Sequence, residues 1–570
     1  MNDNRNMLLA IVLSALVLIG WSFLSEKFFP TADPQTQQVE KGKVQPAPAP
    51  QADAAAEVPQ AVRPREVVLA ETPRVKIATP RLEGSINLKG ARFDDLKLVR
   101  QRDTIDRKSP PVRLLSPAGA KDGYFAQFGW SGQGVATPDA NSIWTPSAPI
   151  LAPGNPVTLS WSNPTGQRFE LIVSVDDGYL FTLKQRVVNG GAGAVGLRAF
   201  ALASRTSQSP DPSSWTQHVG PMGFLGGKAN YDVDWETLDE NKAGVTLDSR
   251  GGWLGFTDKY WLTALIPAKG APVEASFRKS ASGAYQVDYA GNSFVVAPGQ
   301  AVTAEARLFS GAKEKQFLDR YENEGITSLS KSIDWGWFEW FMRPIFNLLN
   351  WLFGVLGNFG LAIIALTVIV RTILFPIADK QFRSMAGMRK VQPKMKALQE
   401  RYKDDKPRLQ QEMLNLYKEE KINPAAGCLP ILLQIPIFYA LYKVLLVSVE
   451  MRHQPFYLWI KDLSAPDPLT PVNLFGLLPF TPPGFLAIGV LPILLGITMW
   501  IQFKLNPQQP DPVQAQIFSI MPWVLMFVMA PFAAGLQLYW VTNNILSIGQ
   551  QAWLYKRYDM HLSDTHPIKT

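Results

Sequence analysis

The run Val355–Ile377 reads VLGNFGLAIIALTVIVRTILFPI and contains one charged residue, Arg371. It is long enough for an α-helix to cross the roughly 30 Å of hydrocarbon in a bilayer. A cation inside such a helix costs roughly 2.5–3.5 kcal/mol on insertion scales, so it is expected to face water, a partner or a substrate. A simpler interpretation is that Arg371, about six residues or roughly 9 Å from the inner end, extends its side chain to the interface.

Further apolar runs predict a polytopic α-helical membrane protein with six transmembrane helices. Five predicted spans lie in the C-terminal half, at residues 355–377, 428–449, 485–503, 515–533 and 535–554. The sixth is Met7–Leu24, within a predicted signal anchor at residues 1–24. A cleaved signal peptide is the alternative, but no small-x-small cleavage site follows the apolar run.

The distribution of basic residues predicts the orientation of these spans. Residues 378–427 contain 12 Lys and Arg against 7 Asp and Glu, whereas the loop 451–484 contains only Arg452 and Lys461 as basic residues. Basic loops stay on the cytoplasmic side, so residues 378–427 and both termini are predicted to be cytoplasmic. The net charge of +8 therefore indicates membrane orientation rather than nucleic-acid binding.

Composition divides the rest of the chain. Residues 25–66 form a Pro/Ala/Gln-rich tether, and residues 67–330 contain short β-prone runs between Gly, Pro and Asn turns, which predict an exported antiparallel β-sandwich domain. Residues 331–354 are predicted to form an amphipathic helix at the membrane–water interface, with a buried soluble helix as the alternative. Its polar stripe comprises Glu339, Arg343, Asn347 and Asn350.

The cytoplasmic segment 378–427 predicts an antiparallel helical hairpin, because two helix-forming stretches flank the turn Lys403–Lys406. It is either a solvated positive loop or a docking surface for an acidic partner such as a ribosome or anionic lipid. The residues predicted to make those contacts are Arg389, Lys390, Lys394 and Lys396.

Polar side chains inside the predicted spans point to a hydrated, positively charged groove around Arg371. The last span places Gln537, Trp540, Asn544, Ser547 and Gln551 on one helical face, and Thr367, Gln434, Thr498 and Gln502 add polar groups from other spans. Hydrogen bonds between packed helices are the alternative explanation. Lys443, the other charge within a span, is expected to extend to the outer interface.

The residues that are missing exclude several function classes. The predicted spans contain no Asp, Glu or His, so a proton relay or an intramembrane protease has no titratable partner. The chain has one cysteine, no zinc-type Cys/His spacing and no GxxxxGK[ST] phosphate loop. We therefore expect no enzymatic activity, no metal and no cofactor.

Five ordered motifs stand out in the C-terminal half: Leu366–Arg371 (LTVIVR), Met385–Lys394 (MAGMRKVQPK), Tyr417–Pro424 (YKEEKINP), Gly427–Phe438 (GCLPILLQIPIF) and Ala534–Trp540 (AGLQLYW). Together they resemble the motifs of one family, the YidC membrane protein insertases of Gram-negative bacteria. Two positions depart from the family pattern. Lys443 stands where a neutral aromatic residue is more usual, and the tail 556–570 is short and mixed in charge.

The resemblance implies an inner-membrane protein with a five-helix core at residues 355–555, a groove open to the cytoplasm and lipid, and a periplasmic domain of galactose-mutarotase-like fold. The implied partners are nascent membrane proteins, the ribosome, the Sec translocon and the phospholipid bilayer, with no specific nucleic-acid sequence. The residues predicted to bind substrate in the groove are Arg371, Thr367, Gln434, Gln502, Gln537, Tyr539, Trp540 and Asn544.

Two other functions compete with insertion. An anion transporter could use Arg371 as its binding site, but no internal repeat is evident. A periplasmic carbohydrate enzyme would need a general acid and a general base, and the β-rich domain contains one histidine, His218, predicted to lie in a loop.

Overall fold

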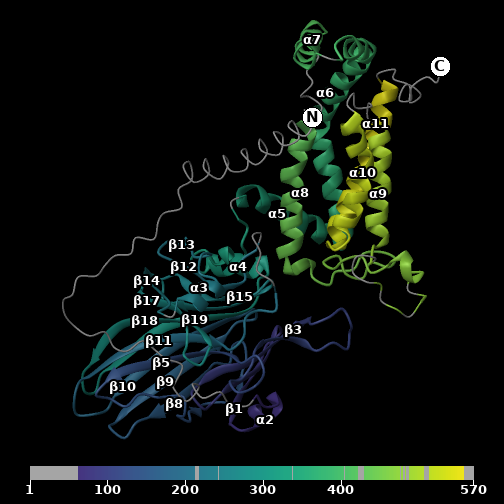
Figure 1. The fold of residues 1–570 in the computed structure, drawn as a ribbon. Helices are drawn as coiled ribbons and strands as arrows, with labels where there is room; N and C mark the ends of the chain where they lie inside the picture. Colours follow the sequence, from purple (N-terminus) through teal and green to yellow (C-terminus); the bar gives the residue numbers. More distant parts are fainter. Residues whose placement is uncertain are drawn as a thin grey trace. The chain divides into compact units, whose positions relative to one another are not determined.

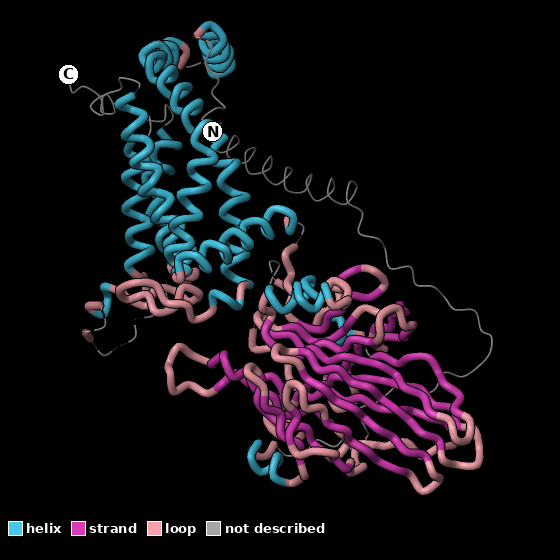
Figure 2. The backbone as a smooth tube through the Cα atoms, turned by 180° about the vertical axis from the view of Figure 1, so that it is seen from behind, coloured by secondary structure: helices cyan, strands magenta, loops and turns pink. Residues whose placement is uncertain are grey.

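The computed structural model describes residues 62–557 except 212–216, 242, 337, 404, 421–428, 476, 479, 481, 483–486 and 506–511. The predicted signal anchor 1–24, nearly all of the tether 25–66, the end of the hairpin segment and most of the tail 556–570 lie outside these residues. Figures 1 and 2 show the β-rich domain and the helices that follow it.

The β-rich domain contains two large sheets, as the turn-rich sequence predicted. The first has the spatial order β14 (Val245–Arg250), β17 (Pro272–Lys279), β18 (Tyr285–Val296), β11 (Val195–Arg205), β5 (Tyr124–Gln133), β3 (Arg92–Arg102), β2 (Leu82–Asn87), β1 (Arg74–Ala78) and β7 (Ile150–Leu151), with β4 (Pro111–Leu115) paired to β3. The second has the order β13 (Lys228–Ala229), β12 (Gly220–Leu225), β15 (Trp253–Thr257), β16 (Trp261–Pro267), β19 (Ala301–Ala312), β10 (Leu180–Asn189), β9 (Gln167–Val175), β8 (Val157–Ser162) and β6 (Thr145–Pro146). All strand pairs are antiparallel except β1 with β7.

Aromatic side chains join the two sheets face to face. Phe93 of β3 meets Phe181 of β10 with ring centroids 5.4 Å apart, and Tyr124 of β5 meets Phe256 of β15 at 5.8 Å. Because neighbouring residues of a strand point to opposite faces, each strand contributes alternate side chains to this shared core. The antiparallel sandwich is therefore confirmed.

Short helices border the sandwich. They are α2 (Arg65–Ala70), α3 (Trp235–Glu240), α4 (Lys315–Asn323) and the 3₁₀ turn η2 (Leu329–Ser332). The predicted tether runs two residues too far, since α2 begins at Arg65, whose buried guanidinium pairs with Asp95.

The amphipathic helix is α5 (Glu339–Leu356), which starts later than the predicted residue 331. Gly336 adopts a positive φ of 69°, and its N–H is accepted by the Asp334 carboxylate at 2.9 Å, so the chain turns before the helix begins. The buried face of α5 comprises Met342, Phe346, Leu349 and Leu352, while Trp340 and Trp351 are exposed.

The remaining helices correspond to the predicted spans and the hairpin. They are α6 (Phe359–Arg401), α7 (Lys406–Glu419), α8 (Leu429–Val447), α9 (Val490–Leu505), α10 (Pro512–Met529) and α11 (Ala534–Arg557), with the 3₁₀ turns η4 (Val449–Met451) and η5 (Pro471–Asn473) between α8 and α9. The predicted boundary between span and hairpin, at residues 377 and 378, lies inside one continuous helix. A single helix of 43 residues, α6, runs through it with Pro376 inside (Figure 1).

One helix among the described residues, Phe359–Lys380, is long and apolar enough to cross a bilayer, and 22% of it is buried. Gln434–Val447, Val490–Leu505 and Gln516–Met529 are shorter apolar helices. Large apolar side chains are exposed on these helices, among them Ile373, Ile435, Trp500, Trp523 and Phe527. An apolar exterior suits contact with lipid, whereas the count of six spans stays a prediction.

Candidate functional site

Arg371 lies half-buried on α6 and is held by one face of α11. Its Nε donates to Asn543 Oδ1 at 2.7 Å, and its Nη2 donates to Ser547 Oγ at 2.5 Å and to the Asn543 carbonyl oxygen at 3.4 Å. Asn543 and Ser547 are one helical turn apart, so their side chains project from the same face of α11. The guanidinium is thus oriented by two residues of a helix far away in sequence.

The acceptors around Arg371 are neutral. In the part of the chain that the structure describes, Arg371 forms hydrogen bonds to an amide, a hydroxyl and a carbonyl, and no ion pair. A guanidinium has five N–H donors. Its orientation is therefore fixed while its positive charge is left uncompensated by a carboxylate.

A second polar contact lies one turn earlier on α11. Gln434 of α8 donates from Nε2 to the hydroxyl of the buried Tyr539 at 2.6 Å. Next to it, Trp540 packs edge-on against Phe438 with ring centroids 4.7 Å apart. These contacts bring α8 to the same helix that holds Arg371.

The other predicted groove residues occupy neighbouring positions. Asn544 donates to Thr498 Oγ1 of α9 at 3.1 Å, and Gln502 follows Thr498 by one turn and is half-buried. Thr367 lies one turn before Arg371 and is buried, with its hydroxyl donating to the Ile363 carbonyl at 2.7 Å. The Asn544 contact is thus a hydrogen bond between packed helices, the alternative raised from the sequence, whereas the Thr367 hydrogen bond stays within α6.

Gln537 is not brought to Arg371. Its side chain is fully buried, and its Nε2 donates to the carbonyl oxygens of Met529, Ala530 and Phe532 at 2.9, 3.3 and 2.8 Å. The amide therefore satisfies the carbonyls left free where α10 ends. The shared periodicity with Trp540 and Asn544 did not indicate this different role.

Asn543 was missed because the sequence pattern selected the adjacent face of the helix. The sequence did contain a signal for Asn543. Asn543 and Ser547 are one helical turn apart, as Thr367 and Arg371 are, so each pair lies on one face of its helix. Two consecutive asparagines in a span allow both faces to carry amides, and only the packing of α6 decides which one meets the arginine.

The prediction for Lys443 is wrong. Its side chain is 1% exposed, and its Nζ lies 3.7 Å from Asp334 Oδ2 instead of extending to the interface. Asp334 precedes α5 and is distant in sequence, so the apolar run around Lys443 gave no sign of it. Pairing with a carboxylate offsets the cost of removing the ammonium group from water.

The hairpin, predicted to be cytoplasmic, has a small core of its own. Val391, Met395 and Leu416 are buried against one another between the end of α6 and α7. Lys394 is exposed and pairs with Glu420 at 2.5 Å, and this hydrogen bond raises the pKa of Lys394. The side chains of Arg389, Lys390 and Lys396 lie outside what the structure describes.

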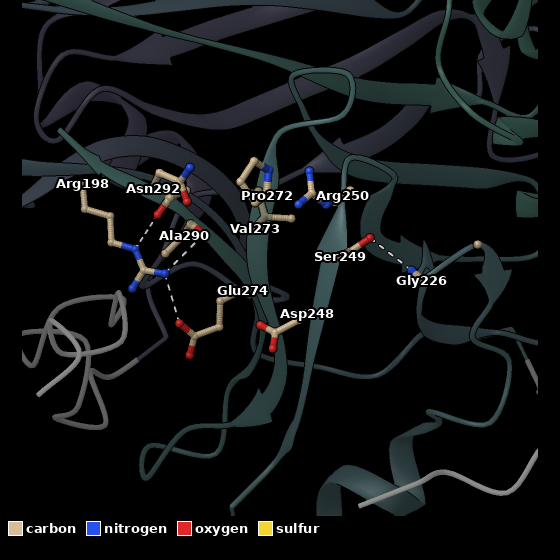
Figure 3. A pocket seen from close by; sticks show the side chains of 12 residues that line it. Arg198, Gly226, Asp248, Ser249, Arg250, Pro272, Val273, Glu274, Ala290 and Asn292 are labelled. Atoms are coloured by element: carbon tan, nitrogen blue, oxygen red, sulfur yellow. Dashed lines mark hydrogen bonds and ion pairs between the residues drawn. The ribbon is translucent and has the colours of Figure 1, made fainter. Parts of the chain in front are cut away.

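A separate cavity of about 580 Å³ lies on the β-rich domain, lined by β11, β14, β17 and β18 and by the turn at Gly226 (Figure 3). Arg198 donates to Glu274 at 3.0 Å and to the Gly291 carbonyl at 2.6 Å, so the side chains pair with each other across the sheet. His218 does not line this cavity. It is buried, with its Nε2 2.9 Å from the Pro221 carbonyl oxygen, and burial lowers its pKa.

In a comparison with known protein families, each half of the chain matches a family model. Residues 74–348 match the family model described as the YidC periplasmic domain, and residues 351–561 match the model described as the 60Kd inner membrane protein. The chain belongs to the YidC family of membrane protein insertases. Members of the YidC family are bacterial inner-membrane proteins with a periplasmic domain, and the family is not enzymatic.

Relatives in the YidC family match over nearly the whole chain. A membrane protein insertase YidC from Zymomonas mobilis is 48% identical over 98% of this chain and 96% of its own length. One from Rhizobium etli is 45% identical over 99% of this chain and 97% of its own length. A crystal structure of an active YidC insertase covers 94% of this chain and 98% of its own at 18% identity, with a TM-score of 0.36.

Proposed function

We propose that this protein inserts nascent membrane proteins into the bacterial inner membrane through a hydrophilic inner-leaflet groove centred on Arg371. The observation that carries the proposal is the oriented guanidinium with neutral partners on α11. The family supports the activity, since relatives at 45–48% identity are named membrane protein insertases.

The electrostatic step follows from the contacts of Arg371. Outside a membrane-embedded site, water screens a guanidinium and weakens its attraction for carboxylates. Half-buried between α6 and α11, the guanidinium attracts an acidic segment more strongly, because screening there is weaker. Asn543 and Ser547 hold it in place without neutralising it, so the charge stays available to the acidic or polar end of a substrate.

The driving force needs no nucleotide. Moving a polar segment across hydrocarbon is opposed by desolvation of its charges and backbone. A groove that reaches part-way shortens this path, and transfer of the substrate's apolar helix into lipid contributes about 25 cal/mol for each Å² removed from water. The exposed apolar side chains of α9 and α10 offer such a helix a lipid-facing exit.

The partners and the orientation are part of the same proposal. The positive-inside distribution places both termini and the hairpin in the cytoplasm, where the exposed Lys394 and its basic neighbours along α6 would meet a ribosome. Cooperation with the Sec translocon follows from the family resemblance. The periplasmic β-rich domain serves as a scaffold for partners and for the helices.

Reconstitution tests the function directly. The purified chain is placed in liposomes and supplied with a small single-span substrate whose exported end is acidic. We expect insertion without ATP, measured as protection of the exported end from added protease. Empty liposomes are the control. Passage of a small anion across the membrane without insertion of the substrate would contradict the proposal and favour the alternative function, anion transport.

A further inference from the structure

Lys443 links the membrane helices to the β-rich domain through one carboxylate. Asp334 Oδ2 lies 3.7 Å from Lys443 Nζ and also accepts the N–H of His218 at 3.0 Å. Asp334 Oδ1 accepts the N–H of Gly336, where the chain turns into α5. Asp334 thus joins the start of α5, the segment before β12, and α8.

Two further contacts tie the outer end of α8 to the same domain. The half-buried Glu450 of η4 accepts the N–H of Lys315, the first residue of α4, at 2.8 Å. Arg452 donates to the carbonyl oxygens of Arg102 and Asp103 at 2.6 and 3.1 Å. Together with Lys443, these residues hold three successive points of α8 and its extension.

The same helix carries a residue of the proposed groove. Gln434 precedes Lys443 on α8 and bonds to Tyr539, one turn before the asparagine that holds Arg371. A helix is stiff along its axis, so fixing its outer end limits the rotation and tilt available at Gln434. The ion pair of Lys443 with Asp334, at the outer end of α8, therefore limits how Gln434 is placed at the inner end of the same helix.

We propose that Asp334 and Lys443 are positioning residues for insertion, through which the periplasmic domain fixes α8 relative to Arg371. The inference rests on the proposed function. It assigns the β-rich domain a direct part in the helix core. It also gives a reason for a lysine within an otherwise uncharged span.

The test compares variants that lack the ion pair with a variant in which a covalent cross-link replaces it. Asp334→Asn removes the negative charge and keeps one acceptor oxygen, enough for one of the two N–H groups of His218 and Gly336. Lys443→Met removes the positive charge at similar length. Each single variant should insert the single-span substrate about tenfold more slowly, because Asp334→Asn leaves the buried Lys443 ammonium without its carboxylate and Lys443→Met removes the contact of α8 with Asp334. Lys461→Met, at an exposed lysine in the loop after α8, is the matched control and should insert normally.

The double variant separates positioning from folding. In Lys443→Met with Asp334→Asn no buried charge is left unpaired, so thermal stability should return towards that of the parent chain. Insertion should stay slow, because nothing then holds α8. Joining Lys443→Cys to Asp334→Cys with a short bis-maleimide linker, in a Cys428→Ser background, should restore it.

Two results would overturn the inference. One is insertion by the uncharged double variant at the parental rate, and the other is a bridged variant no faster than its unbridged form. Arg371→Ala is assayed in parallel, so that failure of the proposed groove is distinguishable. A normal rate for Arg371→Ala would reject the groove, while the Lys443 variants still report on positioning.

Discussion

Arg371 illustrates what a single residue in the sequence indicates and what it leaves undetermined. A lone cation in an apolar run is costly in lipid, which was sufficient to predict that it would find polar surroundings. The identity of those surroundings depends on which face of α11 packs against α6. Asn543 and Ser547 became evident as its partners only from the folded helices.

Removing the guanidinium should impair insertion. We expect Arg371→Ala to slow insertion of a substrate with an acidic exported end by about tenfold or more, given the strength of charge attraction in a poorly screened site. Arg371→Lys should largely preserve the rate, because the charge is kept. Both are measured in the reconstituted assay. Thr372→Ala, at the exposed next position of α6, is the matched control, and equal rates for Arg371→Ala and Thr372→Ala would contradict the electrostatic role.

Asp288 should make the stability of the periplasmic domain depend on pH. Burial raises the pKa of its carboxyl from 3.8 to about 6, although Arg278 and Gln286 act in the opposite direction. Between these values the folded state holds a proton that the unfolded state has lost. Stability from this group therefore rises as pH falls from above 6 towards 4, by at most roughly 1.4 kcal/mol for each pH unit of that window.

The measurement for Asp288 is the thermal unfolding midpoint of the full chain in detergent at pH 7, 6, 5 and 4. The parent chain and Asp288→Asn are compared, so contributions from other titrating groups cancel. The difference between the two chains should change across this window. A constant difference would show that Asp288 has the same pKa in both states.

At the scale of elements, α6 shows that a boundary drawn from composition need not be the end of a helix. The sequence changes from apolar to basic after Ile377, which predicts a span followed by a separate hairpin arm. The backbone hydrogen bonds of a helix do not depend on whether the side chains are apolar or basic, so the helix continues to Arg401. Hydrophobicity thus predicts which part lies in lipid, whereas the helix itself ends at Arg401, where Tyr402 is its C-cap.

The hairpin should be separable from the spans. Leu416 is buried between α7 and the end of α6, against Val391 and Met395. Leu416→Asp should part the two arms and slow insertion, because a charge is unfavourable in that small core. The spans should remain folded, since their contacts lie elsewhere. Leu414→Asp, at an exposed position of α7, is the control.

Limited proteolysis and the insertion assay check the hairpin prediction together. Cleavage within residues 378–427 should become faster in Leu416→Asp, while the fragments on either side stay protected in detergent. A rate of insertion unchanged by opening the hairpin would count against a receiving role for it.

At the scale of the whole molecule, orientation can be read from two cysteines. In a Cys428→Ser background, Glu305→Cys on the exposed face of β19 should react with a membrane-impermeant maleimide from the periplasmic side. Lys394→Cys on the hairpin should react only after the inner membrane is opened. Labelling of Lys394→Cys in intact spheroplasts would reverse the predicted topology.

The sequence predicted the layers of the molecule better than the contacts between them. Alternation and turn residues were sufficient for an antiparallel sandwich, and apolar runs for the helices of the core. The partner of Lys443 could not be predicted from the sequence, because Asp334 belongs to a different segment and the pair forms only when α5 packs on α8. Gln537 was assigned to the groove for the same reason, since periodicity gives a face but not its neighbour.

Pro376 gives α6 a mechanical property. Proline has no N–H for the carbonyl one turn earlier, so α6 lacks a backbone hydrogen bond there, just beyond Arg371, as it does again at Pro393. About 25 residues follow it, a lever of roughly 38 Å at 1.5 Å per residue. Bending by about 10° at this pivot would swing the far tip by roughly 7 Å. A force applied to the tip, for example by a bound partner, would in this way change the helix geometry next to the Arg371 guanidinium.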